Sequence, residues 1–388
     1  MLVRYYGHVG VPSGYGDAAN ELCMAMLSAG MDLEIQTDGT QLHKRFLPLA
    51  TCVRAIDDLS PNPDVVIIHT LPLDCLKVLK HVRESLEGWS RARGRDPLYV
   101  AYTTWEGVGY AGPIFGVAEE FDRLWVPSNS NAAAFSECSS ASLIRGIPDV
   151  VPHAYDPDEL EGKVVPCRRD MRYAFLYSGA WSMRKNVEGV IRAYLRAFTA
   201  SEAVVLKLNC SDAPPDACRI AQVATGLTLE QMPTVEFSNA RVSDDEIWAM
   251  HASTDCFVTA SRGEAWNLPA FKAMLAGQHV IAPSGQGSDD FLGGTSAYLY
   301  ESRVVPASGE VRLDNITAEG ATARYWGCQG LTVREDWMEP DIASLSLLMR
   351  RAWAQHVIRL DIHYDPAARF GREVVGKYVR DLLEGALR

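Results

Sequence analysis

The sequence predicts an α/β protein with two doubly wound parallel sheets, and three features of the chain support this prediction. Short apolar runs alternate with amphipathic helical patterns, an order typical of parallel sheets. The chain has 388 residues, of which 47% are hydrophobic, and this is enough to bury two cores. The alternation begins a second time near Arg172, after a polar stretch. We therefore expect domains at 1–157 and 171–365, a linker at 158–170 and a closing segment at 366–388.

Charge and cysteine content restrict the classes of partner and the compartment. The formal net charge is −12, from 37 Lys and Arg against 49 Asp and Glu, which argues against nucleic acid or anionic membrane as the main binding surface. The nine cysteines show no CxxC spacing and no clustering with histidine, which favours buried thiols in a reducing compartment. The chain shows no export signal and no run of eighteen apolar residues. We therefore expect a cytoplasmic protein without a transmembrane segment.

The first strand is predicted at 2–6, followed by a glycine-containing loop at 7–16 and a helix that ends at Gly30. Without side chains, backbone amides can approach an anion at the positive end of a helix, so this loop suits a phosphate. Asp32 and Glu34 follow at the distance where a dinucleotide-binding fold has its ribose-binding acid, but the glycines do not have the G-x-G-x-x-G order. A tight turn without a ligand stays open for this loop.

The first half continues with strands at 64–69 and 97–102 and a helical pattern at 73–86 between them. Glu106 follows the second of these strands. A further strand near 123–127 leads into a helix that starts at Ser128 or Asn129. An isolated glutamate at a strand end more commonly caps or pairs locally than binds a ligand, and this alternative stays open for Glu106.

The second half opens with a strand at 172–177, a loop that contains Gly179, Arg184 and Lys185, and a helix at 187–198. The two basic residues before the helix form a candidate anion site, although a solvated surface is the alternative. Further strands are predicted at 203–208 and 234–237. Ser243, with Glu246 three residues later, has the spacing of a capping box.

The stretch 256–283 is predicted to be a strand, loop, helix, strand unit that holds one carboxylate, Glu264, in its loop. Pro269 suits the first helical turn, because it has no amide hydrogen and its φ is already helical. Gly277 suits a left-handed helix end, and a buried strand follows at 279–282. In an open parallel sheet such a loop lies at the carboxyl ends of the strands, where ligands bind.

This stretch resembles a known signature. The order Ser-Arg-Gly-Glu-x-Trp-x-Leu-Pro-x-x-x-Ala-Met-x-x-Gly-x-x-Val-Ile-Ala, 261–282, is similar to the donor-binding signature of retaining GT-B glycosyltransferases of the GT4 type. Thr-x-Trp-Glu at 103–106 and Val-Pro-Ser at 126–128 resemble a subgroup of that family. The resemblance covers nearly the whole chain and is strongest from 172 to 300. It implies two Rossmann-like domains facing across a cleft, a last helix that packs back on the first domain, and transfer of a hexose or pentose from a nucleoside diphosphate sugar.

The resemblance also implies roles for single residues. Arg184 and Lys185 would hold the donor diphosphate, because its departure leaves negative charge that charge-assisted hydrogen bonds stabilise. Glu264 would face the donor sugar, and Glu106 would lie on the acceptor side. Lys272 stands where the family has a ribose-binding glutamate, so a group that only donates hydrogen bonds replaces an acceptor. The remaining donor-binding candidates are Gly14, Tyr15 and Gly16 in a loop closing from the first domain, Gly179, and the backbone of Ala265, Trp266, Asn267 and Leu268.

No metal and no resident cofactor are expected. Asp156-Pro157-Asp158 has the D-x-D order of metal-dependent transferases, but the proline favours a turn. A phosphorylase of this architecture would need a lysine bound to pyridoxal phosphate, which the sequence does not place. Two alternatives to a transferase stay open: a non-catalytic bilobal protein that binds a sugar or nucleotide, and a GT-B-like epimerase. The acceptor stays open among a glycan, a lipid-linked sugar, a small molecule, a protein and a modified nucleobase.

Overall fold

The computed structural model divides the chain into two compact units. It describes residues 1–39, 42–107, 115–137, 148–160, 171–211, 213, 226–228, 230–240, 242–306, 311–312, 332–333 and 336–388. The first unit comprises Met1–Pro157, Ser308–Glu335 and Asp365–Arg388, and the second comprises Asp158–Ala307 and Asp336–Tyr364. Of the expected linker, 161–170 lies outside the described residues.

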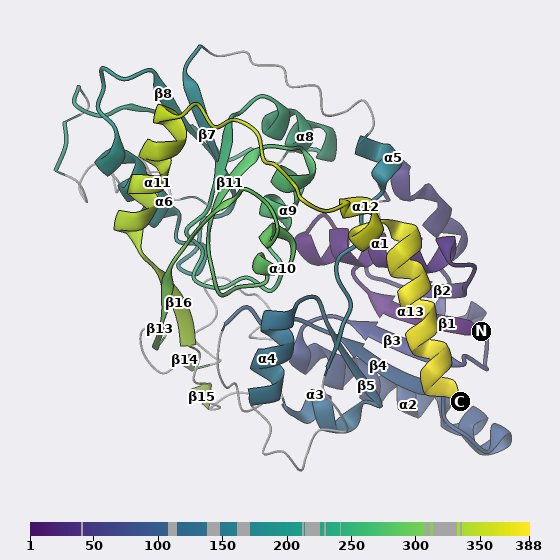
Figure 1. Ribbon diagram of the computed structural model, residues 1–388. Coiled ribbons are helices and arrows are strands. Elements are labelled where there is room, and N and C mark those ends of the chain that lie inside the picture. The colour runs from purple at the N-terminus through teal and green to yellow at the C-terminus, as the bar shows by residue number, and fades with distance from the viewer. Residues whose placement is uncertain are drawn as a thin grey trace. The chain divides into compact units, whose positions relative to one another are not determined.

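The first unit is built on a six-stranded parallel sheet (Figure 1). The strand order is β2-β1-β3-β4-β5-β6, and all five pairings are parallel. Strands β1, β3 and β4 follow the predicted apolar runs, and β3 is buried along its whole length. The strands are β1 (Leu2–Gly7), β2 (Asp32–Gln36), β3 (Val65–His69), β4 (Leu98–Tyr102), β5 (Arg123–Val126) and β6 (Asp149–Val150).

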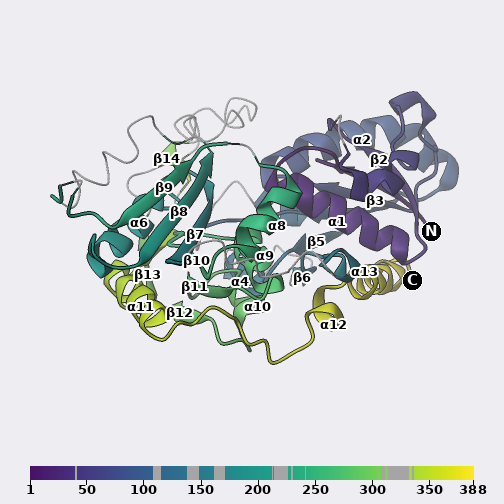
Figure 2. The same ribbon diagram turned by 90° about the horizontal axis from the view of Figure 1, so that it is seen from above.

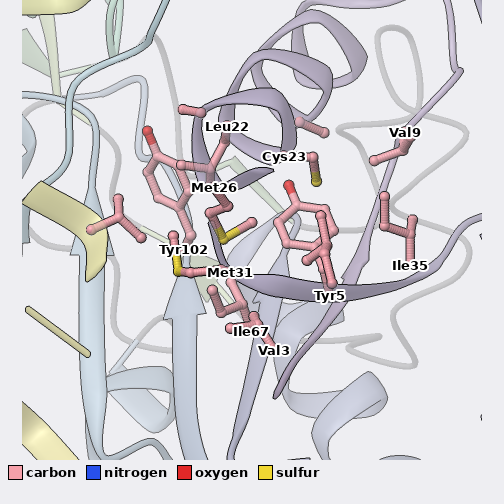
Figure 3. Packing of buried hydrophobic residues seen from close by; sticks show 14 of the residues in the cluster. Val3, Tyr5, Val9, Leu22, Cys23, Met26, Met31, Ile35, Ile67 and Tyr102 are labelled. Carbon is pink, nitrogen blue, oxygen red and sulfur yellow. The ribbon is translucent and has the colours of Figure 1, made fainter. Parts of the chain in front are cut away.

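Helices cover both faces of this sheet. On one face, α1 (Gly14–Ser28) packs its apolar residues against Tyr5 of β1 and Tyr102 of β4 (Figure 3). On the other face, α2 (Pro72–Arg93) packs against β3 and β4. The C-terminal helix α13 (Arg372–Leu387) lies along α1, where a β-carbon on Gly376 would stand 1.9 Å from the Ala25 carbonyl oxygen. The shorter helices are α3 (Phe115–Glu120), α4 (Asn129–Glu137), α5 (Pro157–Leu160) and α12 (Pro366–Phe370), with 3-10 helices at Lys44–Thr51 and Ile56–Asp58.

The second unit repeats the architecture. Its parallel sheet has the order β12-β11-β10-β7-β8-β9, and Figure 2 shows β7, β8 and β9 side by side. Apolar side chains from α6 and α11 share one core with this sheet. The strands are β7 (Tyr173–Ala180), β8 (Val204–Ser211), β9 (Thr234–Ser238), β10 (Cys256–Val258), β11 (His279–Pro283) and β12 (Tyr298–Tyr300). The helices are α6 (Val187–Ala197), α8 (Asp244–Ala252), α9 (Leu268–Leu275), α10 (Asp289–Leu292) and α11 (Ile342–Ala354).

Two short antiparallel ladders complete the described strands. The first pairs β13 (Ser302–Pro306) with β16 (Asp336–Pro340), and the second pairs β14 (Val311–Arg312) with β15 (Thr332–Val333). They form small sheets of their own, separate from the two parallel sheets. The structure thus confirms the α/β class with two parallel sheets.

Several element boundaries differ from the sequence prediction. Helix α1 begins at Gly14, so the last three residues of the expected loop are helical, because Ser13 caps the helix and accepts a hydrogen bond from the Gly16 amide. Strand β7 continues to Ala180, because its pairing with β8 persists as far as Ser211. The proline of the 156–158 stretch starts helix α5, a one-turn helix in place of the expected turn. Among the described helices, none combines the length and apolar character that crossing a membrane requires.

Candidate functional site

The candidate site of the second unit forms where β7 and β10 end. These strands are neighbours in the sheet and run in parallel, so the loops that follow them leave from the same edge. Each loop leads into a helix capped by an asparagine in the left-handed conformation, Asn186 (φ 50°) before α6 and Asn267 (φ 76°) before α9. The asparagine side chains accept from the amides of Gly189 and Ala270. Asparagine tolerates this conformation and caps helices well, so both helices begin at a defined point beside the loops.

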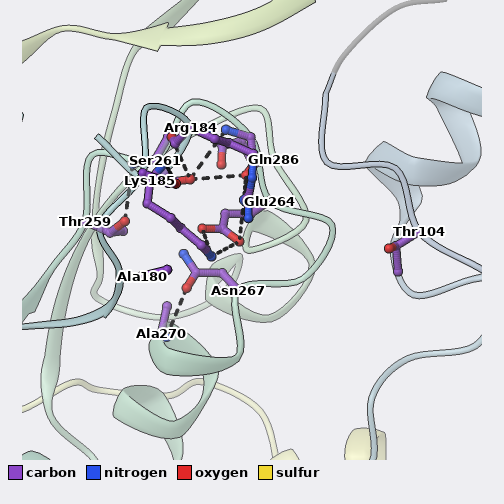
Figure 4. A network of polar contacts seen from close by, with 12 residues as sticks. Thr104, Ala180, Arg184, Lys185, Thr259, Ser261, Glu264, Asn267, Ala270 and Gln286 are labelled. Atoms are coloured by element: carbon purple, nitrogen blue, oxygen red, sulfur yellow. Dashed lines mark hydrogen bonds and ion pairs between the residues drawn. The ribbon is translucent and has the colours of Figure 1, made fainter. Parts of the chain in front are cut away.

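Glu264 is the centre of the site (Figure 4). It is only 6% exposed, and Lys185 Nζ donates to its two carboxylate oxygens at 2.7 and 2.8 Å. Arg184 lies 3.6 Å from the same carboxylate and donates to the Gly263 carbonyl at 2.6 Å. Burial opposes ionisation of this carboxyl, but the charges of Lys185 and Arg184, with hydrogen bonds from Lys185 and Ser261, lower its pKa. The structure therefore joins the three residues predicted for the diphosphate and the sugar into one buried ionic cluster.

A second layer of hydrogen bonds holds this loop. The Gln286 side chain donates to the Ser261 carbonyl at 2.7 Å, and the Gly287 amide donates to the Glu264 carbonyl at 2.9 Å. A β-carbon on Gly287 would lie 1.9 Å from the Ala265 carbonyl oxygen, so only glycine fits this approach. The sequence analysis did not identify Gln286 or Gly287 as supports of Glu264.

Lys272 forms an ion pair with Asp244, a contact that the sequence did not indicate. Its ammonium lies 3.2 Å from Asp244 Oδ1, at the first residue of α8. Both side chains are largely buried, with 12% and 13% of their surfaces exposed. Lys272 thus holds a carboxylate from the preceding helix.

The residues between Glu264 and α9 are used mainly for packing and capping. Trp266 is buried against Phe271 and Phe291, with ring centroids 5.4 and 5.1 Å apart. Ala265 and Asn267 are also buried, and Leu268 is half-buried. Gly179 lies in strand β7 instead of the expected loop, beside the ring of Tyr177.

In the first unit, Tyr15 and Gly16 lie in the first turn of α1. The Tyr15 hydroxyl is hydrogen-bonded to Thr104 Oγ1, and its ring lies 6.0 Å from the rings of both His8 and His69. Gly16 is required for packing, because a β-carbon there would lie 1.8 Å from the Val11 carbonyl oxygen. The three candidates Gly14, Tyr15 and Gly16 thus form a helix start and not a free loop.

Glu106 follows β4 and is half-buried. The residue before it is held firmly, since Asn131 of α4 accepts from the Trp105 amide at 2.9 Å and donates to the Trp105 carbonyl at 2.8 Å. His69, at the end of β3, stacks on Tyr102 at 4.2 Å and contacts the Tyr5 hydroxyl at 2.5 Å. Burial, together with His153 and His8, lowers the pKa of His69 well below its usual value, so its ring is neutral. The sequence analysis did not identify the histidines of this edge.

Across the described ranges, no group of three or more His, Cys, Asp or Glu side chains is placed to hold a metal ion. The two acids of the Asp156-Pro157-Asp158 stretch lie in different surroundings: Asp156 pairs with Arg372 of α13, whereas Asp158 lies within α5.

Comparison with known proteins finds solved structures whose fold is similar to that of this chain. No family model matches the sequence, and neither does any curated protein. The lipopolysaccharide outer core galactosyltransferase WaaB is similar at a TM-score of 0.61 and 14% identity, over 99% of both chains. The trehalose-phosphate synthase of Burkholderia xenovorans gives 0.59 and 12% over 100% of both chains. The sucrose-phosphate synthase of Thermosynechococcus elongatus gives 0.56 and 13% over 100% of this chain and 95% of its own. At these identities the likeness establishes the fold, and the chain has the α/β architecture of GT-B glycosyltransferases.

Proposed function

We propose that this protein is a glycosyltransferase that moves a hexose or pentose from a nucleoside diphosphate sugar to an acceptor, with retention at the anomeric carbon, in the manner of the GT4 type. The observation that carries the proposal is the buried cluster of Glu264, Lys185 and Arg184 at the carboxyl edge of the second sheet. Two cations and one carboxylate give the cluster a net positive charge, which suits a diphosphate. Similar folds have been solved with UDP-2-fluoro glucose and with glucose-6-phosphate.

Each residue of the cluster has a proposed task. Arg184 and Lys185 bind the diphosphate and stabilise the charge that grows on it as the bond to the sugar breaks. Glu264 accepts hydrogen bonds from sugar hydroxyls, and the backbone at Ala265, Trp266, Asn267 and Leu268 lies close to the sugar or phosphate. The acceptor oxygen bonds to the anomeric carbon on the face that the diphosphate leaves, and the acceptor proton passes to the departing phosphate oxygen. Glu106, Gly14, Tyr15, Gly16 and Gly179 are proposed as further contacts, and the reaction is proposed to need no metal or resident cofactor.

The function is tested by incubating the protein with a panel of nucleotide sugars and measuring release of nucleoside diphosphate. The parent should release it from at least one donor, and Arg184→Ala and Lys185→Ala should each lower the rate. Free nucleoside diphosphate should also inhibit both variants less well than the parent. Parental inhibition in both variants would show that the basic pair does not hold the diphosphate. An intact sugar nucleotide whose sugar has altered stereochemistry would identify an epimerase instead.

The place of Lys272 suggests a finer proposal about the ribose. An ammonium cannot accept from the ribose hydroxyls, and here it is already engaged with Asp244. We propose that Lys272 contributes to donor binding by holding the Asp244 carboxylate and that the site makes a weak demand on the two ribose hydroxyls. Comparing the binding of the cognate nucleoside diphosphate with that of its 2′-deoxy form tests this proposal.

A further inference from the structure

The first unit contains a groove whose lining includes none of the proposed donor-binding residues. Its volume is about 1050 Å³, near the upper end of pockets that enclose a small ligand. Helix α2 lines this groove, and so does the segment around the 3-10 helix Ile56–Asp58. The floor is the sheet face at β1 and β3, where Tyr6 and the buried Ile68 line the groove. Helices α2 and α3 pack over β3, β4 and β5 on this face, and the groove lies where that cover ends.

The groove is long. The lining residues of α2 run from Asp74 to Trp89 at positions 74, 77, 78, 81, 85, 86 and 89, which is one face of a helix. Asp74 and Trp89 are fifteen residues apart in sequence, which in an α helix corresponds to about 22 Å at 1.5 Å per residue. Helix α2 starts at the carboxyl edge of the sheet, directly after β3, so the groove leads from that edge along the sheet.

Its two ends differ in chemistry. At the carboxyl edge, His8 lies between two polar partners, with Nε2 3.1 Å from Thr70 Oγ1 and Nδ1 3.4 Å from Asp38. Toward the far end of α2 the lining includes the apolar side chains of Leu86 and Trp89, together with Ser85. Ile56 is 70% exposed and Trp89 is 45% exposed, an unusual exposure for large apolar side chains that line one groove.

The charges of the lining cancel. Arg4 and Lys77 give +2, and Asp38 and Asp74 give −2, so these four side chains sum to zero. Arg4 is paired with Glu34 at 3.2 Å, and Lys77 with Asp74 at 3.3 Å. Cations that are already neutralised by carboxylates do not favour an anionic chain such as a fatty acid or a phospholipid. A neutral apolar chain has no such conflict.

We propose that this groove binds the uncharged apolar tail of the acceptor, with the hydroxyl-bearing head of the acceptor at the polar end formed by His8 and Thr70. The inference rests on the proposed function, because it assumes that an acceptor is used. It deepens that function by defining the acceptor class as a neutral amphiphile with an extended aliphatic or aromatic tail. Burial of each methylene from water then supplies affinity, while the carboxyl edge of the sheet receives the group to be glycosylated.

The probes are n-octyl, n-decyl and n-dodecyl β-D-glucoside, each below its micelle concentration, with binding measured by calorimetry. Affinity for the parent should rise by up to about fourfold for each added methylene, which corresponds to about 0.8 kcal/mol. Ile56→Asp and Trp89→Ser alter exposed side chains, so folding should persist, and each should weaken dodecyl glucoside binding by about tenfold. Leu347→Asp alters a comparable side chain of the second unit, 71% exposed, and should bind as the parent does. Dodecanoate should bind more weakly than dodecyl glucoside.

The outcomes separate this proposal from the proposed function, because nucleoside diphosphate release is measured on the same variants. A flat chain-length series, or parental binding by Ile56→Asp and Trp89→Ser, overturns the groove proposal whatever the donor assay shows. Graded binding without turnover of any nucleotide sugar shows that the groove takes an apolar ligand and overturns its role for an acceptor. Dodecanoate binding as tightly as dodecyl glucoside overturns the neutral class. Self-association that disappears in both groove variants assigns the groove to a second copy of the chain.

Discussion

Replacing Glu264 by glutamine tests the central ion pair, because the change keeps the shape of the side chain and removes its charge. The carboxylate accepts two hydrogen bonds from Lys185, at 2.7 and 2.8 Å. In the glutamine side chain, one of these oxygens becomes an NH2 group that faces another donor. Losing a hydrogen bond to a charged group costs about 1.5–3 kcal/mol, and leaving a buried charge unpaired costs about 3–5 kcal/mol. Since 17% of the Lys185 side chain is exposed and can be hydrated, we expect the free energy of unfolding to fall by about 2–3 kcal/mol.

The assay is urea unfolding at pH 7 of the parent, Glu264→Gln, Lys185→Met and the double variant. The double-mutant cycle should show a coupling energy of at least about 1 kcal/mol, because the two side chains contact each other directly. Glu236→Gln is the matched control. Its carboxylate pairs with Arg172 at 2.8 Å, but 47% of its surface is exposed, so its loss should be under about 1 kcal/mol. A Glu264→Gln variant within about 0.5 kcal/mol of the parent, or a coupling near zero, would refute the reasoning.

The same ion pair predicts a dependence of stability on pH. The pKa of Glu264 is lower in the folded protein than its ordinary value of 4.5, so the unfolded state binds a proton first as the pH falls. The stabilisation is therefore complete above about pH 4.5 and is lost as the pH falls through the folded pKa. Across that window the unfolding free energy of Glu264→Gln should fall less steeply than that of the parent. Parallel curves for the two proteins would contradict the lowered pKa.

Three further predictions concern positions around the site. The 2′-deoxy form of the cognate nucleoside diphosphate should bind the parent with less than about 1–2 kcal/mol of penalty in calorimetry, and a larger penalty would show that the ribose hydroxyls are read despite Lys272. Lys272→Glu should lower the melting temperature more than Lys272→Met, because it places a second carboxylate beside Asp244, and equal melting temperatures would disprove that contact. Gly287→Ala should lower the unfolding free energy by about 2 kcal/mol or more, because the added β-carbon would clash with the Ala265 carbonyl oxygen. Gly385→Ala, in open space on α13, is the control and should raise the unfolding free energy by about 0.5–1 kcal/mol. A reversed order of the two variants in urea unfolding would refute both expectations.

Local sequence patterns determined much of the fold. The apolar runs of β3 and β11 and the amphipathic pattern of α6 appear in the structure where the chain predicted them. Ser243 and Glu246 form the predicted capping box, and Gly277 is left-handed at φ 67° as expected. These features depend on contacts within a few residues, so periodicity and capping chemistry were sufficient to predict them. The position of Glu264 between a strand and a helix was predictable for the same reason.

The tertiary structure alone decided which side chains meet. Lys185 and Glu264 are 79 residues apart in sequence, and they pair because the sheet order places β10 beside β7. Lys272 and Asp244 are 28 residues apart, and their contact depends on how α8 and α9 pack. The groove of the first unit likewise depends on where α2 stops covering the sheet. A parallel sheet brings together strands that are distant along the chain, and the packing of the connecting helices decides which of their side chains meet. Local periodicity carries no information about strand order or helix packing, so these contacts are properties of the folded chain.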